Sequence, residues 1–154
     1  MTIFNIGDLN AALGPQGRLL GLDLGSKTVG LALSDVTRTI ATPMETLVRG
    51  KFAPLAKRLF EIIEDHEVKG LVIGLPVSMD GTEGPRCQAT RQFVANVLEI
   101  RDIAVAFWDE RLSTAAVERV LINEADMTRK RRRAVIDKAA AAYILQGALD
   151  AGRS

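Results

Sequence analysis

Two short segments of consecutive apolar residues constrain the fold of this chain most strongly. They are Leu71-Val72-Ile73 and the run from Ile103 to Trp108. A strand that is apolar at consecutive positions is typical of a parallel sheet buried on both faces by helices. The residues before the first segment, 52–66, repeat their apolar positions at helical spacing, with Leu55, Leu59, Ile62 and Ile63 on one stripe. This succession of helix and buried strand predicts a sheet with helices packed on it.

The N-terminal half predicts antiparallel strands. Two apolar runs, Leu19–Leu24 and Val29–Leu33, are separated by the turn-rich link Gly25-Ser26-Lys27-Thr28. This pattern predicts a β-hairpin whose first strand ends near an acidic residue, Asp23. Residues 37–48 supply a third strand, in which Pro43 indicates a bulge or an edge position.

Three further helices are expected. Pro85 is a favourable first residue for one that runs through Phe93. Ser113 is a candidate N-cap for a second, and Thr128 caps a last helix that continues to about Leu149. The order of elements predicts an α/β fold, a mixed β-sheet flanked by α-helices.

Length and composition limit the domain organisation. The chain has 154 residues, which suits one domain with one core. Residues 1–17 end in the breakers Gly14-Pro15-Gln16-Gly17 and are interpreted as an N-terminal extension. The domain proper is expected at residues 18–150. We expect Ile3, Phe4 and Ile6 to pack against its edge.

Composition excludes several classes of protein. Hydrophobic residues make up 47% and charged residues 25% of the chain, which is ordinary for a globular protein, and the formal net charge is only +1. The single cysteine, Cys87, excludes an internal disulfide and a cysteine-cluster metal site. No apolar run is long enough to span a membrane. We therefore expect a cytoplasmic protein without a membrane partner.

Three carboxylates are candidates for catalysis and metal binding. Asp23 ends the first strand of the hairpin, Glu110 follows the last apolar strand, and Asp137 lies inside the last helix. Ligand sites of open α/β sheets gather beyond the carboxyl ends of parallel strands. Carboxylates there suit Mg²⁺ or Mn²⁺, and two such ions can hydrolyse a phosphodiester.

Each carboxylate also has a structural interpretation. Asp23 can cap the turn, Glu110 can pair with Arg111, and Asp137 can pair with Arg133 on the same helix. Asp109 is a rival to Glu110, because adjacent strand residues point to opposite faces and the phase is not fixed by the sequence.

Basic residues are concentrated in one segment, residues 129–133. A run of charges is typical of a solvated face. Here, however, Lys130, Arg133 and Asp137 fall at i, i+3 and i+7, on one face of a helix. That spacing places two cations beside the acidic site, as a phosphate backbone requires. Lys27, in the hairpin turn after Gly25, is a further candidate phosphate contact.

Four motifs resemble the YqgF (RuvX) family. They are Leu22–Asp35, Gly74–Pro85, Trp108–Thr114 and Val135–Ala141. They occur in family order and span roughly residues 19–149. Gly74–Pro85 is the most specific of them.

The resemblance implies a ribonuclease-H-like fold related to Holliday-junction resolvases, in a bacterial cytoplasmic protein. It implies a metal-dependent nuclease that processes the 5′ end of the small-subunit (16S) rRNA precursor. The family's acidic positions fall on Asp23, Glu110 and Asp137. The expected nucleic-acid contacts are Lys27, Arg111, Lys130 and Arg133.

Two positions depart from the patterns of relatives. Family members often have Arg where this chain has Thr28, which removes one candidate phosphate contact. The strand that ends at Gly74 lacks the terminal Glu of junction resolvases, so Glu110 is left to complete the acidic site.

Other functions stay open at this point. The partner is pre-rRNA or branched DNA, and the protein is a monomer or a homodimer. A Holliday junction resolvase and a non-catalytic RNA-binding ribosome-assembly factor are the alternatives to an endonuclease acting on RNA. An actin-like kinase also begins with a strand, Asp-x-Gly and a hairpin, but it needs two such domains, and the 154 residues hold no second copy of the motif.

Overall fold

The computed structural model describes residues 3–78, 80–110 and 129–152 and, within the last range, the side chains from residue 136 onward. Its strands are β1 (Ile3–Phe4), β2 (Arg18–Leu24), β3 (Thr28–Ser34), β4 (Ala41–Val48), β5 (Val68–Leu75) and β6 (Ala104–Asp109). Its helices are α1 (Ile6–Leu13), α2 (Phe52–Asp65), α3 (Pro85–Ile100) and α5 (Arg129–Gly152).

The strands form one six-stranded mixed sheet in the order β1-β6-β5-β2-β3-β4. The chain makes a β2–β3–β4 antiparallel meander and then adds β5 and β6 parallel to β2 on its other side. β2 therefore lies between the antiparallel and the parallel half of the sheet. The α/β class and the mixed sheet predicted from the sequence are confirmed, and this order is that of a ribonuclease-H-like fold.

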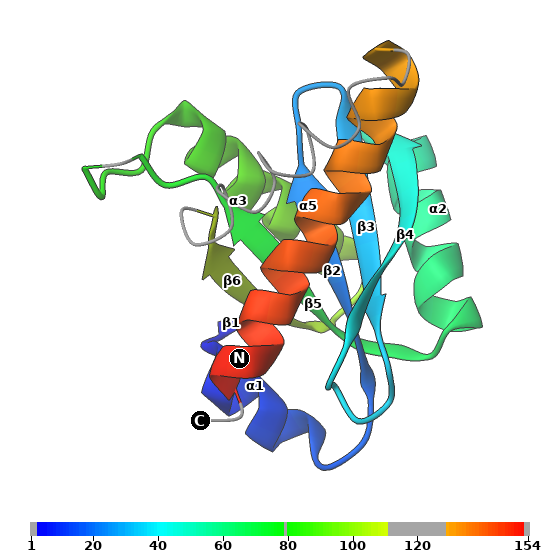
Figure 1. Cartoon of the computed structure of the whole chain (residues 1–154), viewed down its shortest axis with the longest axis vertical. Helices are drawn as coiled ribbons and strands as arrows, with labels where there is room; N and C mark the ends of the chain where they lie inside the picture. Colours follow the sequence, from blue (N-terminus) through cyan, green and yellow to red (C-terminus); the bar gives the residue numbers. More distant parts are fainter. Residues whose placement is uncertain (1–2, 79, 111–128, 153–154) are drawn as a thin grey trace.

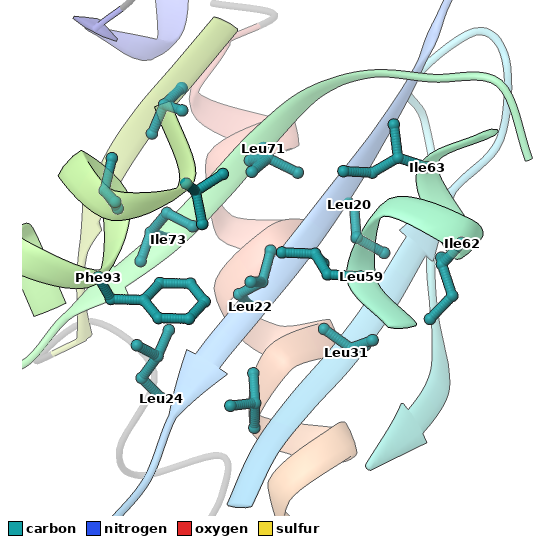
Figure 2. Close-up of a cluster of buried hydrophobic side chains, with 14 of the residues drawn as sticks. Leu20, Leu22, Leu24, Leu31, Leu59, Ile62, Ile63, Leu71, Ile73 and Phe93 are labelled. Carbon is teal, nitrogen blue, oxygen red and sulfur yellow. The ribbon is translucent and has the colours of Figure 1, made fainter. Parts of the chain in front are cut away.

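Helices α2 and α3 cover one face of the sheet. Alternate residues of the central strands, among them Leu20, Leu22 and Ile73, pack there against Leu59 of α2 and Phe93 of α3. Figure 2 shows these side chains between the strands and the two helices. Because each is almost fully buried, this layer supplies most of the hydrophobic stabilisation on that face.

Helix α5 covers the opposite face and runs along the sheet (Figure 1). Its small residues, such as Ala141 and Ala148, pack on the alternate strand residues Ala32 and Val72. Glycines bring the helix closer still. A Cβ at Gly21 would lie 2.8 Å from Leu145 Cβ and 3.1 Å from the Ala141 carbonyl oxygen. The Ala-rich sequence of α5 thus meets a sheet face that has little side-chain volume.

The N-terminal segment is integrated into the fold. β1 pairs in parallel with β6 at the edge of the sheet, and α1 packs on α5 with Leu9 fully buried. Phe4 and Ile6 pack on the same core, as expected from the sequence, whereas Ile3 is exposed. Arg38 reinforces this contact, because its buried guanidinium donates to the Asn10 side chain and to backbone carbonyls of the adjoining loop.

The third strand of the meander is found where the sequence predicts it, with a small shift in its first residue. β4 is an edge strand, and its pairing with β3 skips a residue beside Pro43, so that residue marks both an edge and a bulge. Strand structure begins at Ala41, because residues 37–40 form a turn around the Asp35 carboxylate.

The helix expected from Ser113 to Ile122 lies outside the described residues. None of the helices described here is long and apolar enough to cross a membrane.

Gly30 provides a test of the contact between α5 and the sheet. A Cβ at this position would overlap the backbone carbonyl of Asp137. We expect Gly30→Ala to push α5 away and to lower the free energy of unfolding by about 1–3 kcal/mol, the usual cost of overpacking. Chemical denaturation measures this.

Gly7→Ala is the matched control, because the added Cβ meets only an ordinary contact, 3.6 Å from Asn5 Oδ1. It lies in helix α1, so alanine should be neutral or stabilising. Equal stabilities of the Gly30→Ala and parent proteins would contradict the close packing of α5.

Candidate active site

The alternation of side chains along the strands decides which carboxylates meet. On β6, Val105 and Phe107 face the α2–α3 core, whereas Ala106 and Trp108 face α5. Glu110 follows directly after β6, and its side chain lies against Gly74, which Ile144 of α5 approaches on the same side. Glu110 is thus distinguished from its rival Asp109, which ends β6.

Asp23 and Glu110 are in direct contact. Asp23 lies near the end of β2, and its carboxyl group is hydrogen-bonded to that of Glu110. Burial is the main cause that raises the pKa of Asp23 to about 8, followed by the hydrogen bond to Glu110 and its negative charge. At neutral pH, the pair therefore holds a proton that a cation can replace.

Gly74 makes room for this pair. It lies near the carboxyl end of β5, between the ends of β2 and β6. A Cβ there would lie 2.8 Å from Glu110 Oε1 and 2.9 Å from Glu110 Cγ. The side chain of Glu110 consequently lies over β5, where a larger residue at position 74 would stand.

Asp137 reaches the same face from α5. Its backbone carbonyl lies against Gly30, which is the cross-strand partner of Asp23. Directly opposed residues of antiparallel strands point to the same face, so Asp23 and Asp137 are on the same side of the sheet. The hydroxyl group of Thr28, at the start of β3, donates a hydrogen bond to Asp137 Oδ2.

The three carboxylates do not all play the same part in this geometry. Asp23 and Glu110 form a hydrogen-bonded pair, whereas Asp137 lies on the same face of the sheet and is bonded to Thr28. Among the described residues, no group of three or more His, Cys, Asp or Glu is arranged to hold a metal ion. The pair itself fits a hard divalent cation, because it offers carboxylate oxygens whose shared proton such an ion would displace.

Asp35 lies elsewhere. It follows β3 at the end of that strand remote from Thr28. Its carboxylate accepts hydrogen bonds from the backbone of Ile40 and Thr39 and from the Thr37 hydroxyl, which lowers its pKa to about 2. Asp35 therefore organises the β3–β4 turn and is no part of the acidic pair.

The cations expected from the sequence to contact nucleic acid belong to separate elements. Lys27 is exposed in the β2–β3 turn. That turn is held by Arg49, whose guanidinium donates to the Gly25 carbonyl over 2.6 Å and whose backbone amide donates to the Lys27 carbonyl over 2.9 Å. Lys130 and Arg133 lie in the first turns of α5, the orange end of that helix in Figure 1. Arg111 lies outside the described residues.

The motif set matches a known family. The model of the RuvX family, described as Holliday junction resolvase, matches residues 17–151. The chain belongs to the RuvX family.

Curated relatives of this family match almost end to end. A protein of Paramagnetospirillum magneticum is 60% identical over 97% of this chain and 96% of its own length. One of Rhodospirillum rubrum is 58% identical over 98% of this chain and 94% of its own. Both carry the name "Putative pre-16S rRNA nuclease". This RuvX chain is thus a member of a nuclease family.

Solved structures agree on the fold. RuvC of Thermus thermophilus is 13% identical and has a TM-score of 0.52 over 87% of this chain and 95% of the RuvC chain. The structure of that RuvC in complex with a Holliday junction substrate has a TM-score of 0.53, at 12% identity, over 90% of this chain and 96% of that one. The RuvX chain therefore shares the ribonuclease-H-like fold of RuvC.

Arg86 is a site residue that sequence reasoning missed. It is the second residue of α3 and exposed, and its positive charge partly offsets the rise in the pKa of Asp23. Its position after Gly84-Pro85, in the first turn of the helix that follows a parallel strand, was the available signal. The roles of Thr28 and Gly74 depend on contacts far apart in sequence and had no such signal.

The acidic pair predicts how stability depends on pH. In the folded metal-free protein the pKa of Asp23 is about 8, raised from 3.8. Between these values the folded state binds more protons than the unfolded state, so the free energy of unfolding falls as pH rises. We expect Asp23→Asn to remove this fall. At pH 8 its melting temperature should exceed that of the parent, by about 2–4 °C for each kcal/mol gained in the free energy of unfolding.

Thermal melts from pH 4 to pH 9 in a chelator measure this. Asp102→Asn, in the exposed loop between α3 and β6, is the control for loss of a carboxylate. Its curve of melting temperature against pH should run parallel to that of the parent. Parallel curves for Asp23→Asn and the parent would show that the pair is not strained.

Proposed function

We propose that this chain is a metal-dependent endonuclease that processes the 5′ end of the 16S rRNA precursor in the bacterial cytoplasm. The observation that carries the proposal is the hydrogen-bonded pair of Asp23 and Glu110 near the carboxyl ends of β2 and β6. The names of the curated relatives support the choice of substrate.

The proposed chemistry follows from the acidic pair. Asp23 and Glu110, with Asp137 beside them, hold Mg²⁺ or Mn²⁺, two ions in our proposal. When bound, the ions activate a water molecule and stabilise the leaving oxygen of the phosphodiester. The protein contributes fixed positions: burial and the hydrogen bond hold Asp23 and Glu110 together, and the packing of α5 on Gly30 places Asp137.

Cations around the acidic pair bind the RNA backbone in this proposal. They are Lys27 in the hairpin turn, Arg86 at the start of α3, and Lys130 and Arg133, which belong to the first turns of α5. Such contacts orient a phosphate backbone but read no sequence. Arg111, next to Glu110 in the sequence, belongs to the same proposed set.

A Holliday junction resolvase acting on branched DNA is the second candidate. The description of the matching family model favours it. The resemblance to junction resolvases leads us to expect a glutamate at the end of β5. This chain has Gly74 there, and the side chain of Glu110, which follows β6, occupies the space over it. Either substrate is a phosphodiester, so only cleavage assays with both distinguish them.

The cleavage activity of the Asp23→Asn variant tests the proposed function. The change keeps the volume of the side chain and removes one ligand charge, so we expect cleavage to fall on the order of 10²–10³-fold, the scale for a group that stabilises transition-state charge. The assay incubates pre-16S rRNA, single-stranded RNA and a four-way DNA junction in parallel, each with Mg²⁺ or Mn²⁺. Asp102→Asn should cleave like the parent.

The pattern of products decides between the candidates. Cleavage of the junction alone would favour the resolvase. Binding of pre-16S rRNA without cleavage under any metal would favour a non-catalytic ribosome-assembly factor. Normal cleavage by Asp23→Asn would contradict the assignment of the site.

The two cations in the first turns of α5 predict a change in the salt dependence of RNA binding. We expect the double variant Lys130→Ala, Arg133→Ala to bind RNA more weakly and to lower the slope of log affinity against log salt by about one per lost contact. The control replaces Lys57 and Lys69, two exposed cations on α2 and at the start of β5, with alanine. Filter binding at several salt concentrations measures both, and equal slopes in the two double variants would mean that the α5 cations only face solvent.

A further inference from the structure

Thr28 forms a side-chain bond between the sheet and α5 at the edge of the acidic site. It is the first residue of β3, and its hydroxyl group donates to Asp137 Oδ2 across a separation of 109 positions in sequence. Both residues are partly buried. A hydrogen bond to a charged acceptor away from bulk water is stronger than one between neutral groups, so this contact restrains the Asp137 side chain effectively.

The backbone of Asp137 is fixed independently of this bond. Its carbonyl lies against Gly30, two residues along the same strand from Thr28 and therefore on the same face of the sheet. With the backbone held by packing, the remaining freedom of the Asp137 carboxylate is rotation about its side-chain bonds. The Thr28 hydroxyl group removes that freedom.

Thr28 is itself held in place. Its carbonyl oxygen accepts the Gly25 amide over 2.8 Å in the hairpin turn, and Arg49 donates to the Gly25 and Lys27 carbonyls on the other side of that turn. Its β-branched side chain also has few rotamers. The backbone that carries the donor is therefore held on both sides of the turn.

We propose that Thr28 is a positioning residue for Asp137: its hydroxyl group fixes the orientation of the carboxylate on the face of the sheet that carries the Asp23–Glu110 pair, so that Asp137 can join the pair in binding the divalent cation. This inference rests on the proposed function of the acidic site and assigns a role to a residue outside its carboxylates. Hydrogen bonds from outer groups to carboxylate ligands typically contribute 10–100-fold to metal affinity or activity. Removing this donor should therefore weaken metal binding without removing any metal ligand.

Two substitutions isolate the hydroxyl group. Thr28→Val keeps the β-branched shape and removes the donor, whereas Thr28→Ser keeps the donor and removes a methyl group. Thr42→Val, on the exposed part of β4, controls for a threonine-to-valine change in a strand. The melting temperature of each variant in chelator reports whether it folds like the parent.

The measurements are the shift in melting temperature on titration with Mn²⁺, the Mn²⁺ concentration for half-maximal cleavage of pre-16S rRNA, and kcat and KM at saturating Mn²⁺. For Thr28→Val we expect an apparent Mn²⁺ affinity about 10–100-fold lower and a lower kcat, with KM for RNA nearly unchanged. Thr28→Ser and Thr42→Val should resemble the parent. A purely structural role for Thr28 would lower the melting temperature in chelator and leave the Mn²⁺ affinity of the folded protein unchanged.

The outcomes separate this inference from the proposed function. A parent that cleaves, with Thr28→Val equal to it in Mn²⁺ affinity and kcat, overturns the role of Thr28 and leaves the nuclease intact. Tighter Mn²⁺ binding by Thr28→Val also overturns it, because the hydroxyl group would then restrain Asp137 away from the metal. If the parent binds Mn²⁺ without cleaving any substrate, the proposed function fails, and the Mn²⁺ titrations still test Thr28. A parent whose melting temperature does not respond to Mn²⁺ overturns the inference as well.

Discussion

The packing of α5 on the sheet is the constraint on which the rest of this structure depends. Gly21 and Gly30 let the helix backbone approach β2 and β3 more closely than any side chain would allow. The same contact buries the Ala-rich face of α5 and sets the height of Asp137 above the strands. Stability and the position of a candidate catalytic group thus depend on one surface, and a change that loosens the helix also moves the carboxylate.

The acidic pair, in contrast, lowers the stability of the metal-free fold at the place where the proposed chemistry occurs. Burial and the charge of Glu110 both raise the pKa of Asp23, so the folded metal-free protein carries an unfavourable interaction that a proton relieves. The surrounding hydrophobic layers offset this cost, since the strands that end at the pair have fully buried residues such as Leu22, Ile73 and Val105. Such strain in a well-packed sheet is typical of a site made for a ligand of opposite charge.

The sequence predicted a mixed sheet and the succession of strands and helices from β2 to β6, because these depend on local spacing, but it did not predict β1 and α1 in the N-terminal segment. Apolar runs identify β5 and β6, and turn residues identify the β2–β3 hairpin. The choice of Glu110 over Asp109 needed the phase of β6, which only contacts with α5 establish. The roles of Thr28 and Gly74 were beyond prediction, because their partners are distant in sequence. Thr28 was interpreted as a lost phosphate contact, whereas the structure bonds it to Asp137.

The two carboxylates of the pair and Asp137 differ in how they are held, and this difference has a mechanical consequence. Asp23 lies in β2 and Glu110 directly follows β6 of the same sheet, so their separation is set by strand pairing through β5. Asp137 belongs to α5, whose distance from the sheet is set by side-chain packing and by the bond from Thr28. Strand pairing changes only when backbone hydrogen bonds break, whereas helix packing adjusts by small shifts. Binding of a cation between sheet and helix would therefore be accommodated by α5, and Thr28 limits how far Asp137 has to move.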